Sequence, residues 1–428
     1  MLPVAFDPHW RIAPGAWLRT STLRSLSATL QAAESRGRRR REEDAQRYGV
    51  AVECLLANVA AAHLVAPGHA LAVRRHRHRE VVDPVVYGAH LAACLDAAER
   101  CGLLTPNTHG IYSTVTPTAK LLNMLPRPLP LSVLYQVEHQ ACLELRGEKN
   151  EHGQPTVLPF TATAVTETMT REMVELNAWW RSLRVRLAGT HAWLVPSPSG
   201  MLLRIATMQH THCLRIFNGG TFDQGGRLYR AWWVNMEKAQ RRANVLLAGE
   251  PVAEVDFTAQ YLRLAYRHVG AAWTFAANVD PYLPDGCPEE HRDGYKKCTL
   301  SLLSGARGLH LPNDVQDSCL FPPGTKAATV YASIRARHPA LQAAGAFGST
   351  LGNELARVDS DLMVKLLLRL KAAGVPALGI HDAVLVPRSR VDQVARVMVE
   401  TARDMLGMEL PVSVRTESVN ELAPTGTV

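Results

Sequence analysis

The chain has 428 residues, of which 47% are hydrophobic and 20% are charged, and its formal net charge is +8. These proportions are typical of a globular protein long enough for two or three domains. The positive charge permits a nucleic-acid partner without requiring one, because phosphate binding needs clustered lysines and arginines. We expect no membrane span, since no apolar run reaches the necessary length, and the N-terminus lacks the layout of a signal peptide. The eight cysteines form no Cys-x-x-Cys pair, which indicates reduced thiols and a cytoplasmic protein.

Residues 1–125 predict a mainly helical domain. The basic run at 36–44 is more typical of a solvated helix face or a linker than of a binding element. Residues 85–125 predict a helix closed by Gly102, a turn at 105–107, a strand at 111–115 and a further helix. This order resembles the recognition helix and wing of winged helix-turn-helix proteins, which would bind nucleic acid in a groove. The alternative is a helix–turn–strand packing unit with no ligand.

The middle of the chain carries fewer signals. Residues 126–134 predict a linker, and residues 170–189 predict an amphipathic helix with a basic end. Further on, Arg227 directly follows a pair of glycines, whose missing side chains permit close backbone approach. We expect the neighbouring Trp232 and Trp233 to lie in the core, although a stacking surface is the alternative.

Residues 252–269 predict a strand that leads into a helix. The strand covers Val252–Phe257 and carries Asp256 near its end, and Leu262, Ala265 and Tyr266 share one face of the following helix. A carboxylate at the end of a buried strand is well placed to bind a metal ion. A capping aspartate would occupy the same position.

Residues 292–305 predict a helix with two cations on one face. Arg292 and Lys296 are four residues apart, Leu300 and Ser304 continue the same face, and Gly305 ends the helix. Two cations beside catalytic carboxylates would suit a nucleoside triphosphate. An ordinary solvent-exposed basic helix is the alternative.

The stretch GVPALGIHDAVLVP, residues 374–387, places two polar residues within an apolar run. It predicts two short strands with His381 and Asp382 at their turn, so that a second carboxylate lies at the tip of a hairpin. Asp256 and Asp382 together would be able to hold two Mg²⁺ ions roughly 3.5–4 Å apart. Two carboxylates suffice, because Mg²⁺ completes its shell with water and substrate phosphates.

Four stretches in this order resemble motifs of the DNA polymerase I family and of its relatives, the single-subunit phage RNA polymerases. VDFTAQYLRLAY resembles motif A, RDGYKKCTLSLLSG resembles motif B, and IHDAVLV resembles motif C. DQGGRLY resembles the D-x-x-G-R-x-Y segment of the RNA enzymes. The resemblance covers about residues 215–410, half of the chain.

The resemblance implies an α+β fold with a right-hand polymerase-like palm and fingers at 215–428. A linker and a thumb-like helical region would occupy 126–214, after the winged-helix-like domain at 1–125. The implied metal ligands are Asp256 and Asp382, which would hold two Mg²⁺ ions that Mn²⁺ can replace. Arg292 and Lys296 would bind the triphosphate, and Lys296 would also protonate the departing pyrophosphate.

Four further positions follow from the same resemblance. Arg227 and His381 would contact the primer and template. Tyr261 and Ser304 would lie at the nucleotide, where they replace a glutamate and a tyrosine of the DNA enzymes, and Ala383 replaces the acidic residue after motif C. These departures leave the choice of sugar open, although a bulky Tyr261 would obstruct a 2′-hydroxyl and so favours deoxynucleotides.

The function implied is that of a template-directed nucleotidyltransferase of phage or plasmid type. We expect a compact DNA polymerase, without a recognisable proofreading exonuclease, that acts on primed DNA with nucleoside triphosphates and works with replication accessory proteins. The alternatives are an RNA polymerase or primase on the same scaffold, and a DNA-binding replication regulator without catalysis. A metal-dependent hydrolase would need a histidine or carboxylate cluster that the sequence does not show.

Overall fold

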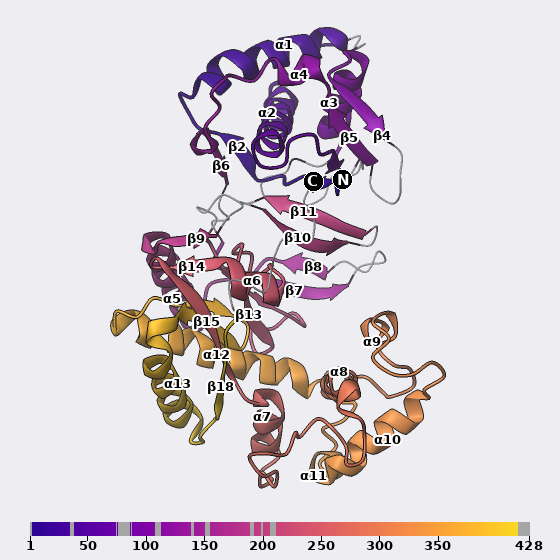
Figure 1. The fold of residues 1–428 in the computed structure, drawn as a ribbon, viewed down its shortest axis with the longest axis vertical. Coiled ribbons are helices and arrows are strands. Elements are labelled where there is room, and N and C mark those ends of the chain that lie inside the picture. Colours follow the sequence, from indigo (N-terminus) through magenta and orange to yellow (C-terminus); the bar gives the residue numbers. More distant parts are fainter. Residues whose placement is uncertain are drawn as a thin grey trace.

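The computed structural model describes residues 2–34, 38–73, 75, 86, 88–107, 113–137, 141–149, 155–188, 192–197, 200–205 and 211–417. These residues form three hydrophobic cores. We name the corresponding parts the N-terminal body, the central body and the α8–α11 lobe, and Figure 1 shows them from top to lower right. The predicted α+β class is confirmed.

The N-terminal body is built around one apolar helix, α2 (Glu42–Val65), which packs against α1 (Arg24–Ala33) and α3 (Ala89–Arg100). By length and composition α2 would be able to cross a membrane, so it is an exception to the expectation that no segment has these properties. In the structure, 72% of the most apolar stretch of α2 is buried inside the protein. Buried core helices of other proteins have the same length and apolar composition, so α2 is only weak evidence for a membrane protein.

The same body contains more β-structure than the sequence predicts. Its main sheet has the order β10-β11-β1-β3-β5-β4. The strands are β1 (Val4–Ala5), β3 (Leu71–Val73), β4 (Leu104–Asn107), β5 (Ser113–Pro117), β10 (Ala192–Ser197) and β11 (Gly200–Ile205). A separate pair is formed by β2 (Trp10–Ile12) and β6 (Leu134–Gln136).

The predicted turn at 105–107 is wrong, because these residues form β4, which pairs with β5. Part of the predicted strand at 111–115 and part of the basic run at 36–44 lie outside the described residues. After β5 comes only a short helix, α4 (Ala119–Leu122). Since β5 also pairs with β3, the hairpin belongs to a larger sheet. No winged-helix module is shown in the described part of the N-terminal body, and that assignment stays a prediction.

The central body contains two further sheets. The larger has the order β16-β17-β15-β14-β9, with β18 also paired to β15, and the smaller has the order β13-β12-β7-β8. The larger consists of β9 (Val185–Leu187), β14 (Val245–Leu247), β15 (Glu250–Phe257), β16 (Leu378–Ile380), β17 (Ala383–Pro387) and β18 (Val412–Arg415). The smaller consists of β7 (Leu143–Lys149), β8 (Pro155–Leu158), β12 (Leu214–Phe217) and β13 (Gly225–Tyr229).

The helices of this body are α5 (Ala164–Ser182), α6 (Lys238–Asn244), α7 (Gln260–His268), α12 (Leu351–Ala372) and α13 (Val391–Leu406). Figure 1 shows α12 running across the body toward the lobe. A side chain at Gly379 in β16 would meet Leu228 and Leu367, each at 2.8 Å, so glycine permits close packing between β13, the hairpin and α12. Trp232 and Trp233 are buried, as predicted.

The predicted boundaries at 125 and 214 stay predictions. The segment between them supplies strands to several sheets: β9 joins the sheet that carries Asp256, whereas β11 pairs with β1 at the other end of the molecule. The hairpin β10–β11 places Trp193 in the central core and Ile205 in the N-terminal core. It therefore links the two bodies.

The lobe consists of α8 (Arg292–Leu303), α9 (Asn313–Asp317), α10 (Ala327–Arg337) and α11 (Pro339–Ala343). Its junction with α7 contains His338, which is 1% exposed and forms a hydrogen bond of 3.1 Å with the Tyr266 hydroxyl. The ring also packs against Phe275 and Phe347. Burial, followed by the charge of Arg337, lowers the pKa of His338 to about 4.

This buried histidine predicts acid sensitivity. Because its pKa is about 4 in the folded state and 6.5 without perturbation, the unfolded chain binds the extra proton between these values. Stability is therefore lost as pH falls from 6.5 toward 4. Wild type should lose about 2 kcal/mol more than His338→Gln between pH 7.5 and pH 4.5 in urea unfolding. Parallel pH profiles for the two proteins would contradict this assignment.

Candidate active site

Asp256 lies near the end of a strand that is central in its sheet. In β15, Val252 to Val255 are buried, and Asp256 is directly opposite Ala383 of β17 on one side and Ser413 of β18 on the other. The predicted strand Val252–Phe257 is confirmed within two residues. Since β15 is paired on both sides, the backbone that carries this carboxylate is held rigidly.

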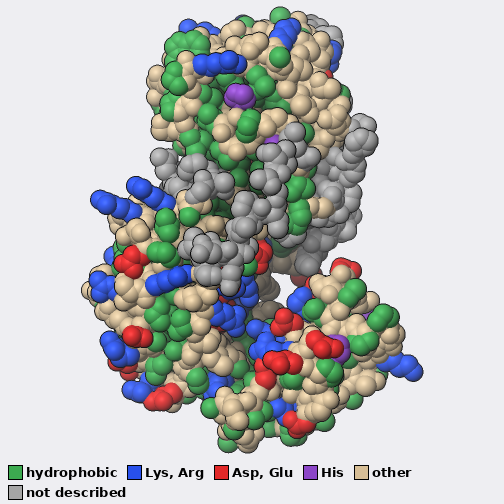
Figure 2. Space-filling model, viewed as in Figure 1, with side chains coloured by type: hydrophobic (Ala, Val, Ile, Leu, Met, Phe, Trp, Pro, Cys, Tyr) green, Lys and Arg blue, Asp and Glu red, His purple; other side chains and the backbone are tan. Residues whose placement is uncertain are grey.

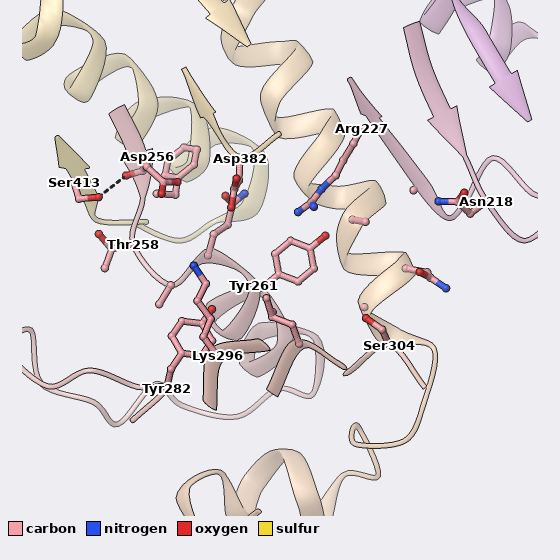
Figure 3. A pocket seen from close by; sticks show the side chains of 18 of the residues that line it. Asn218, Arg227, Asp256, Thr258, Tyr261, Tyr282, Lys296, Ser304, Asp382 and Ser413 are labelled. Carbon is pink, nitrogen blue, oxygen red and sulfur yellow. Dashed lines mark hydrogen bonds between the residues drawn. The ribbon is translucent and has the colours of Figure 1, made fainter. Parts of the chain in front are cut away.

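Asp382 lies in the two-residue turn between β16 and β17, as predicted. Its neighbour His381 has a φ of 45°, a left-handed conformation that is uncommon outside glycine and suits a tight hairpin. Because Ala383 pairs with Asp256, the turn brings the two aspartates to the same end of the sheet. Figure 3 shows them side by side.

A cavity of about 490 Å³ opens in front of the two aspartates. One face of α8 lines it with Arg292, Lys296, Leu300 and Ser304, which confirms the predicted shared face of this helix. Figure 3 shows the Lys296 ammonium pointing from α8 toward the carboxylates. Figure 2 shows Lys and Arg side chains gathered at the hollow between the central body and the lobe.

The electrostatics of the cavity disfavour two ionised carboxylates. Burial, followed by the charge of Asp382, raises the pKa of Asp256 to about 7, and the positive charges of Arg415 and Lys296 act in the opposite direction. The Oδ1 atom of Asp256 is buried and has no hydrogen-bond partner among the described residues. An acceptor without a donor, beside a second carboxylate, is the environment that a bound cation would stabilise.

The oxygen ligands of this pair fit Mg²⁺ or Mn²⁺. Within the described residues no group of three or more His, Cys, Asp or Glu side chains is placed to hold a metal ion. A metal ion here would therefore take two protein carboxylates and complete its shell with water and phosphate oxygens. The two-metal assignment stays a prediction.

Arg292, which is predicted to bind the triphosphate, already has an acidic partner in the structure. Arg292 forms an ion pair with Asp280, and its side chain is 35% exposed. Burial lowers the pKa of this guanidinium, but the hydrogen bond and charge of Asp280 outweigh burial and raise it overall. The residue lines the cavity, yet a phosphate would have to share it with Asp280.

Tyr282 is a cavity residue that the sequence analysis missed. It is 4% exposed, and its ring centre lies 5.7 Å from Nζ of Lys296 and 5.9 Å from Cζ of Arg292. Its backbone N–H donates a 2.8 Å hydrogen bond to Asp280. The only signal in the sequence is an aromatic residue between two prolines, which does not distinguish a site residue from a loop anchor.

Arg227 lies on the opposite wall, at the end of the glycine pair in β13. A side chain at Gly226 would meet the Phe217 ring at 2.7 Å, and the φ of Gly226 is 84°, so this strand needs glycine before Arg227. The guanidinium is 4.8 Å from the centre of the Tyr261 ring. Both residues line the cavity, so the structure brings these two predicted positions together.

Behind this wall lies Asp359, which the sequence analysis also missed. Its carboxylate accepts hydrogen bonds of 3.0 Å from Nε of Arg227 and 2.9 Å from Nε2 of Gln260, and its side chain is fully buried. Burial raises the pKa of Asp359 to about 7, opposed by the charge of Arg227. An acidic residue in an apolar helix was the available signal, but its partners come from a distant strand, β13, and from the start of another helix, α7.

His381 is half-buried and does not line the cavity, although its neighbour Asp382 does. Its ring is 5.5 Å from the Tyr229 ring, and its buried Nδ1 has no hydrogen-bond partner among the described residues. Burial, followed by the charge of Arg227, lowers the pKa of His381 to about 4. A pKa of about 4 favours a neutral imidazole, rather than a cation, at pH 7.

A fourth cation, after Arg227, Arg292 and Lys296, reaches the cavity from outside the predicted motifs. Arg415 of β18 is exposed, lines the cavity and lowers the pKa of Asp256 by its charge. Ser413, on the same strand, donates a 3.5 Å hydrogen bond to the Asp256 carbonyl oxygen. Neither residue has a sequence signal, because strand pairing alone brings β18 beside β15.

Comparisons with known proteins give limited similarity. No family model matches the chain, and no curated protein does. Among solved structures, the fold is similar to the POL domain of Pol1 from M. smegmatis, in a structure described as a complex with DNA primer-template and dNTP. The TM-score is 0.35 and the sequence identity 14%, over 63% of this chain and 57% of that chain. This chain thus matches little more than half of that solved domain, and the family assignment stays a prediction from the motifs.

Proposed function

We propose that the protein is a template-directed nucleotidyltransferase, and specifically a compact DNA polymerase that extends a primer in the cytoplasm. The observation that carries the proposal is the shared cavity, where Asp256 and Asp382 face the cationic side of α8. A nucleoside triphosphate needs both parts: carboxylates for metal binding, and cations for the phosphates. The exposed Lys and Arg side chains at the hollow suit a nucleic-acid backbone.

In the proposed reaction, the primer 3′-hydroxyl attacks the α-phosphorus of the nucleotide. The bond between the 3′-oxygen and the α-phosphorus forms as the bond between the α-phosphorus and the oxygen that bridges to the β-phosphate breaks. The hydroxyl proton passes to solvent water, and pyrophosphate leaves. Asp256 and Asp382 would hold Mg²⁺, which when bound supplies Lewis-acid activation of the hydroxyl and neutralises the leaving group. Lys296 would bind the phosphates and give a proton to the pyrophosphate, with Arg292 beside it.

Three further cavity residues, and His381 next to Asp382, would position the substrates. Tyr261 would lie against the sugar, and Ser304 at the end of α8 beside the base. Arg227 and His381 would contact the primer terminus and template strand. Tyr261 favours deoxynucleotides in this arrangement, because a ring in this position obstructs a 2′-hydroxyl.

The direct test is incorporation of labelled nucleotides on primed single-stranded DNA with Mg²⁺, in parallel with dNTPs, with rNTPs and without primer. Primer extension with dNTPs is the expected result. Product from rNTPs without primer would instead identify an RNA polymerase or primase. A folded protein that binds DNA but incorporates nothing in any tube would overturn the proposal in favour of a replication regulator.

Replacing Lys296 with alanine should lower kcat/KM for the nucleotide by about 100-fold, because a cation that stabilises charge in the transition state is removed. Lys297→Ala is the matched control: this neighbour forms an ion pair of 2.9 Å with Asp314 in the lobe and does not line the cavity. Its activity should be within about twofold of wild type. Equal rates for Lys296→Ala and Lys297→Ala would remove the role proposed for Lys296.

A further inference from the structure

Three elements that are far apart in the sequence meet at one buried carboxylate. Asp359 on α12 accepts from Arg227 on β13 through Oδ2 and from Gln260 at the start of α7 through Oδ1. Asp359 and Gln260 are 0% and 3% exposed. Since both oxygens of the carboxylate are used, Asp359 fixes the distance between the strand and the helix.

These hydrogen bonds close a network of contacts that includes Tyr261. Gln260 precedes Tyr261 in the chain, and the Arg227 guanidinium lies over the Tyr261 ring at 4.8 Å. The Asp359 carboxylate thus holds both the Gln260 side chain at the start of α7 and the guanidinium that packs on the Tyr261 ring. Asp359 itself does not line the cavity, so it has no direct contact with a substrate there.

We propose that Asp359 is a positioning residue that fixes Arg227 and Gln260 and thereby holds Tyr261 where it distinguishes deoxyribose from ribose. The proposal rests on the polymerase function proposed above and adds to it the residue that sets sugar selection. Without Asp359, Arg227 has no anionic partner in the wall and is attracted toward Asp382, whose charge already acts on it. The ring of Tyr261 would then lose its packing partner.

Gln260 makes a conservative substitution informative. Its Oε1 atom is buried and has no hydrogen-bond partner among the described residues. In Asp359→Asn, rotation of the Gln260 amide would let Oε1 accept from the new amide, while the remaining carbonyl oxygen still accepts from Arg227. Asp359→Asn therefore preserves the hydrogen bonds to Arg227 and Gln260 without the negative charge, whereas Asp359→Ala removes these hydrogen bonds.

The test measures kcat/KM for a dNTP and the matching rNTP opposite one template base. The ratio of dNTP to rNTP should fall about tenfold in Asp359→Ala, the size expected for loss of a desolvated cation–π contact, and should stay within about threefold in Asp359→Asn. Asp361→Asn is the matched control on α12: Asp361 pairs with Arg215 at 2.8 Å and does not line this cavity. Its ratio should equal that of wild type.

A double-mutant cycle shows whether Asp359 acts through Tyr261. Tyr261→Ala alone should lower the ratio, and adding Asp359→Ala should lower it no further, because both changes remove the same constraint. A merely structural ion pair would reduce both rates equally and leave the ratio unchanged, which would overturn the positioning role while leaving the polymerase function standing. Absence of incorporation by the wild type would overturn the polymerase function, and with it the role that rests on it.

Discussion

Replacing Asp256 with asparagine is expected to abolish nucleotide incorporation while making the metal-free protein more stable. Loss of a carboxylate that binds catalytic metal should lower kcat by about three orders of magnitude, since metal activation contributes several kcal/mol to the transition state. Asp382→Asn should have a similar effect. Single-turnover primer extension measures the loss, and DNA binding should be close to that of wild type.

The gain in stability follows from the raised pKa of Asp256, which is about 7 in the folded protein and 3.8 without perturbation. Between these values the folded state holds a proton that the unfolded state has lost, so ionisation costs stability as pH rises through this range. Asparagine removes that cost. In EDTA, Asp256→Asn should exceed wild type by on the order of 1–2 kcal/mol at pH 8 and be nearly equal at pH 4.

Asp293→Asn is the control for both measurements. Its side chain is 71% exposed on α8, does not line the cavity and forms a long, exposed ion pair of 3.4 Å with Arg292, so Asp293→Asn should change neither activity nor stability appreciably. Activity in Asp256→Asn near that of Asp293→Asn would overturn the site assignment. A variant that is inactive but no more stable at pH 8 would show that burial and the charge of Asp382 do not penalise the ionised form of Asp256 as inferred.

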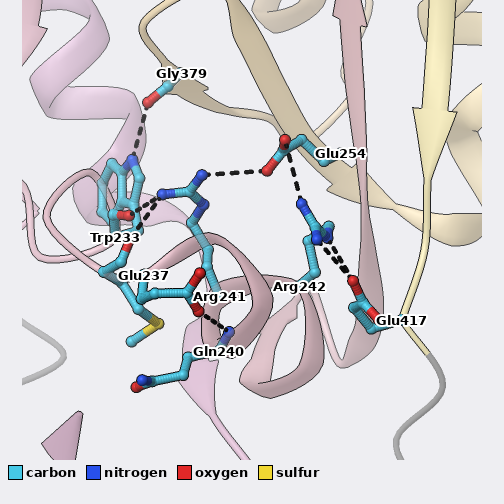
Figure 4. Close-up of polar contacts among 9 residues, drawn as sticks. Trp233, Glu237, Gln240, Arg241, Arg242, Glu254, Gly379 and Glu417 are labelled. Atoms are coloured by element: carbon cyan, nitrogen blue, oxygen red, sulfur yellow. Dashed lines mark hydrogen bonds and ion pairs between the residues drawn. The ribbon is translucent and has the colours of Figure 1, made fainter. Parts of the chain in front are cut away.

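Replacing Glu254 with alanine is expected to destabilise the central body by about 3 kcal/mol, because it leaves a buried arginine without its charge partner. Glu254 and Arg241 are each 3% exposed and lie 3.2 Å apart, and Arg242 lies 3.6 Å from the same carboxylate. Figure 4 shows Glu254 between the two arginines. Among the described residues, Arg241 would keep only its bonds to the carbonyl oxygens of Trp233 and Met236.

Glu417→Ala provides a graded control. Glu417 pairs with Arg242 at 2.7 Å but is 27% exposed, so its loss should cost less than about 1 kcal/mol. The double variant Arg241→Met with Glu254→Leu should recover most of the stability, because it removes both buried charges. Urea unfolding gives the free energies. A cost below about 0.5 kcal/mol for Glu254→Ala would show that water reaches Arg241.

The sequence by itself determined the elements that carry the candidate catalytic groups. An apolar strand ending in Asp256, a helix with Arg292 and Lys296 on one face, and a hairpin with His381 and Asp382 at its turn follow from local periodicity. Each is confirmed by the structure. Local composition was misleading at residues 105–107, which have the composition of a turn but form β4, because they pair with the next strand, β5.

Only the tertiary structure decided which residues surround these groups. Tyr282 and Arg415 reach the site from a loop and the last strand, and Asp359 supports its wall from a helix; no local pattern distinguishes any of the three as functional. The pKa of Asp256 was equally unpredictable, since it depends on burial and on the distance to Asp382 rather than on its neighbours in the chain. Periodicity is a property of consecutive residues, whereas burial, charge coupling and hydrogen-bond partners arise when strands and helices pack together.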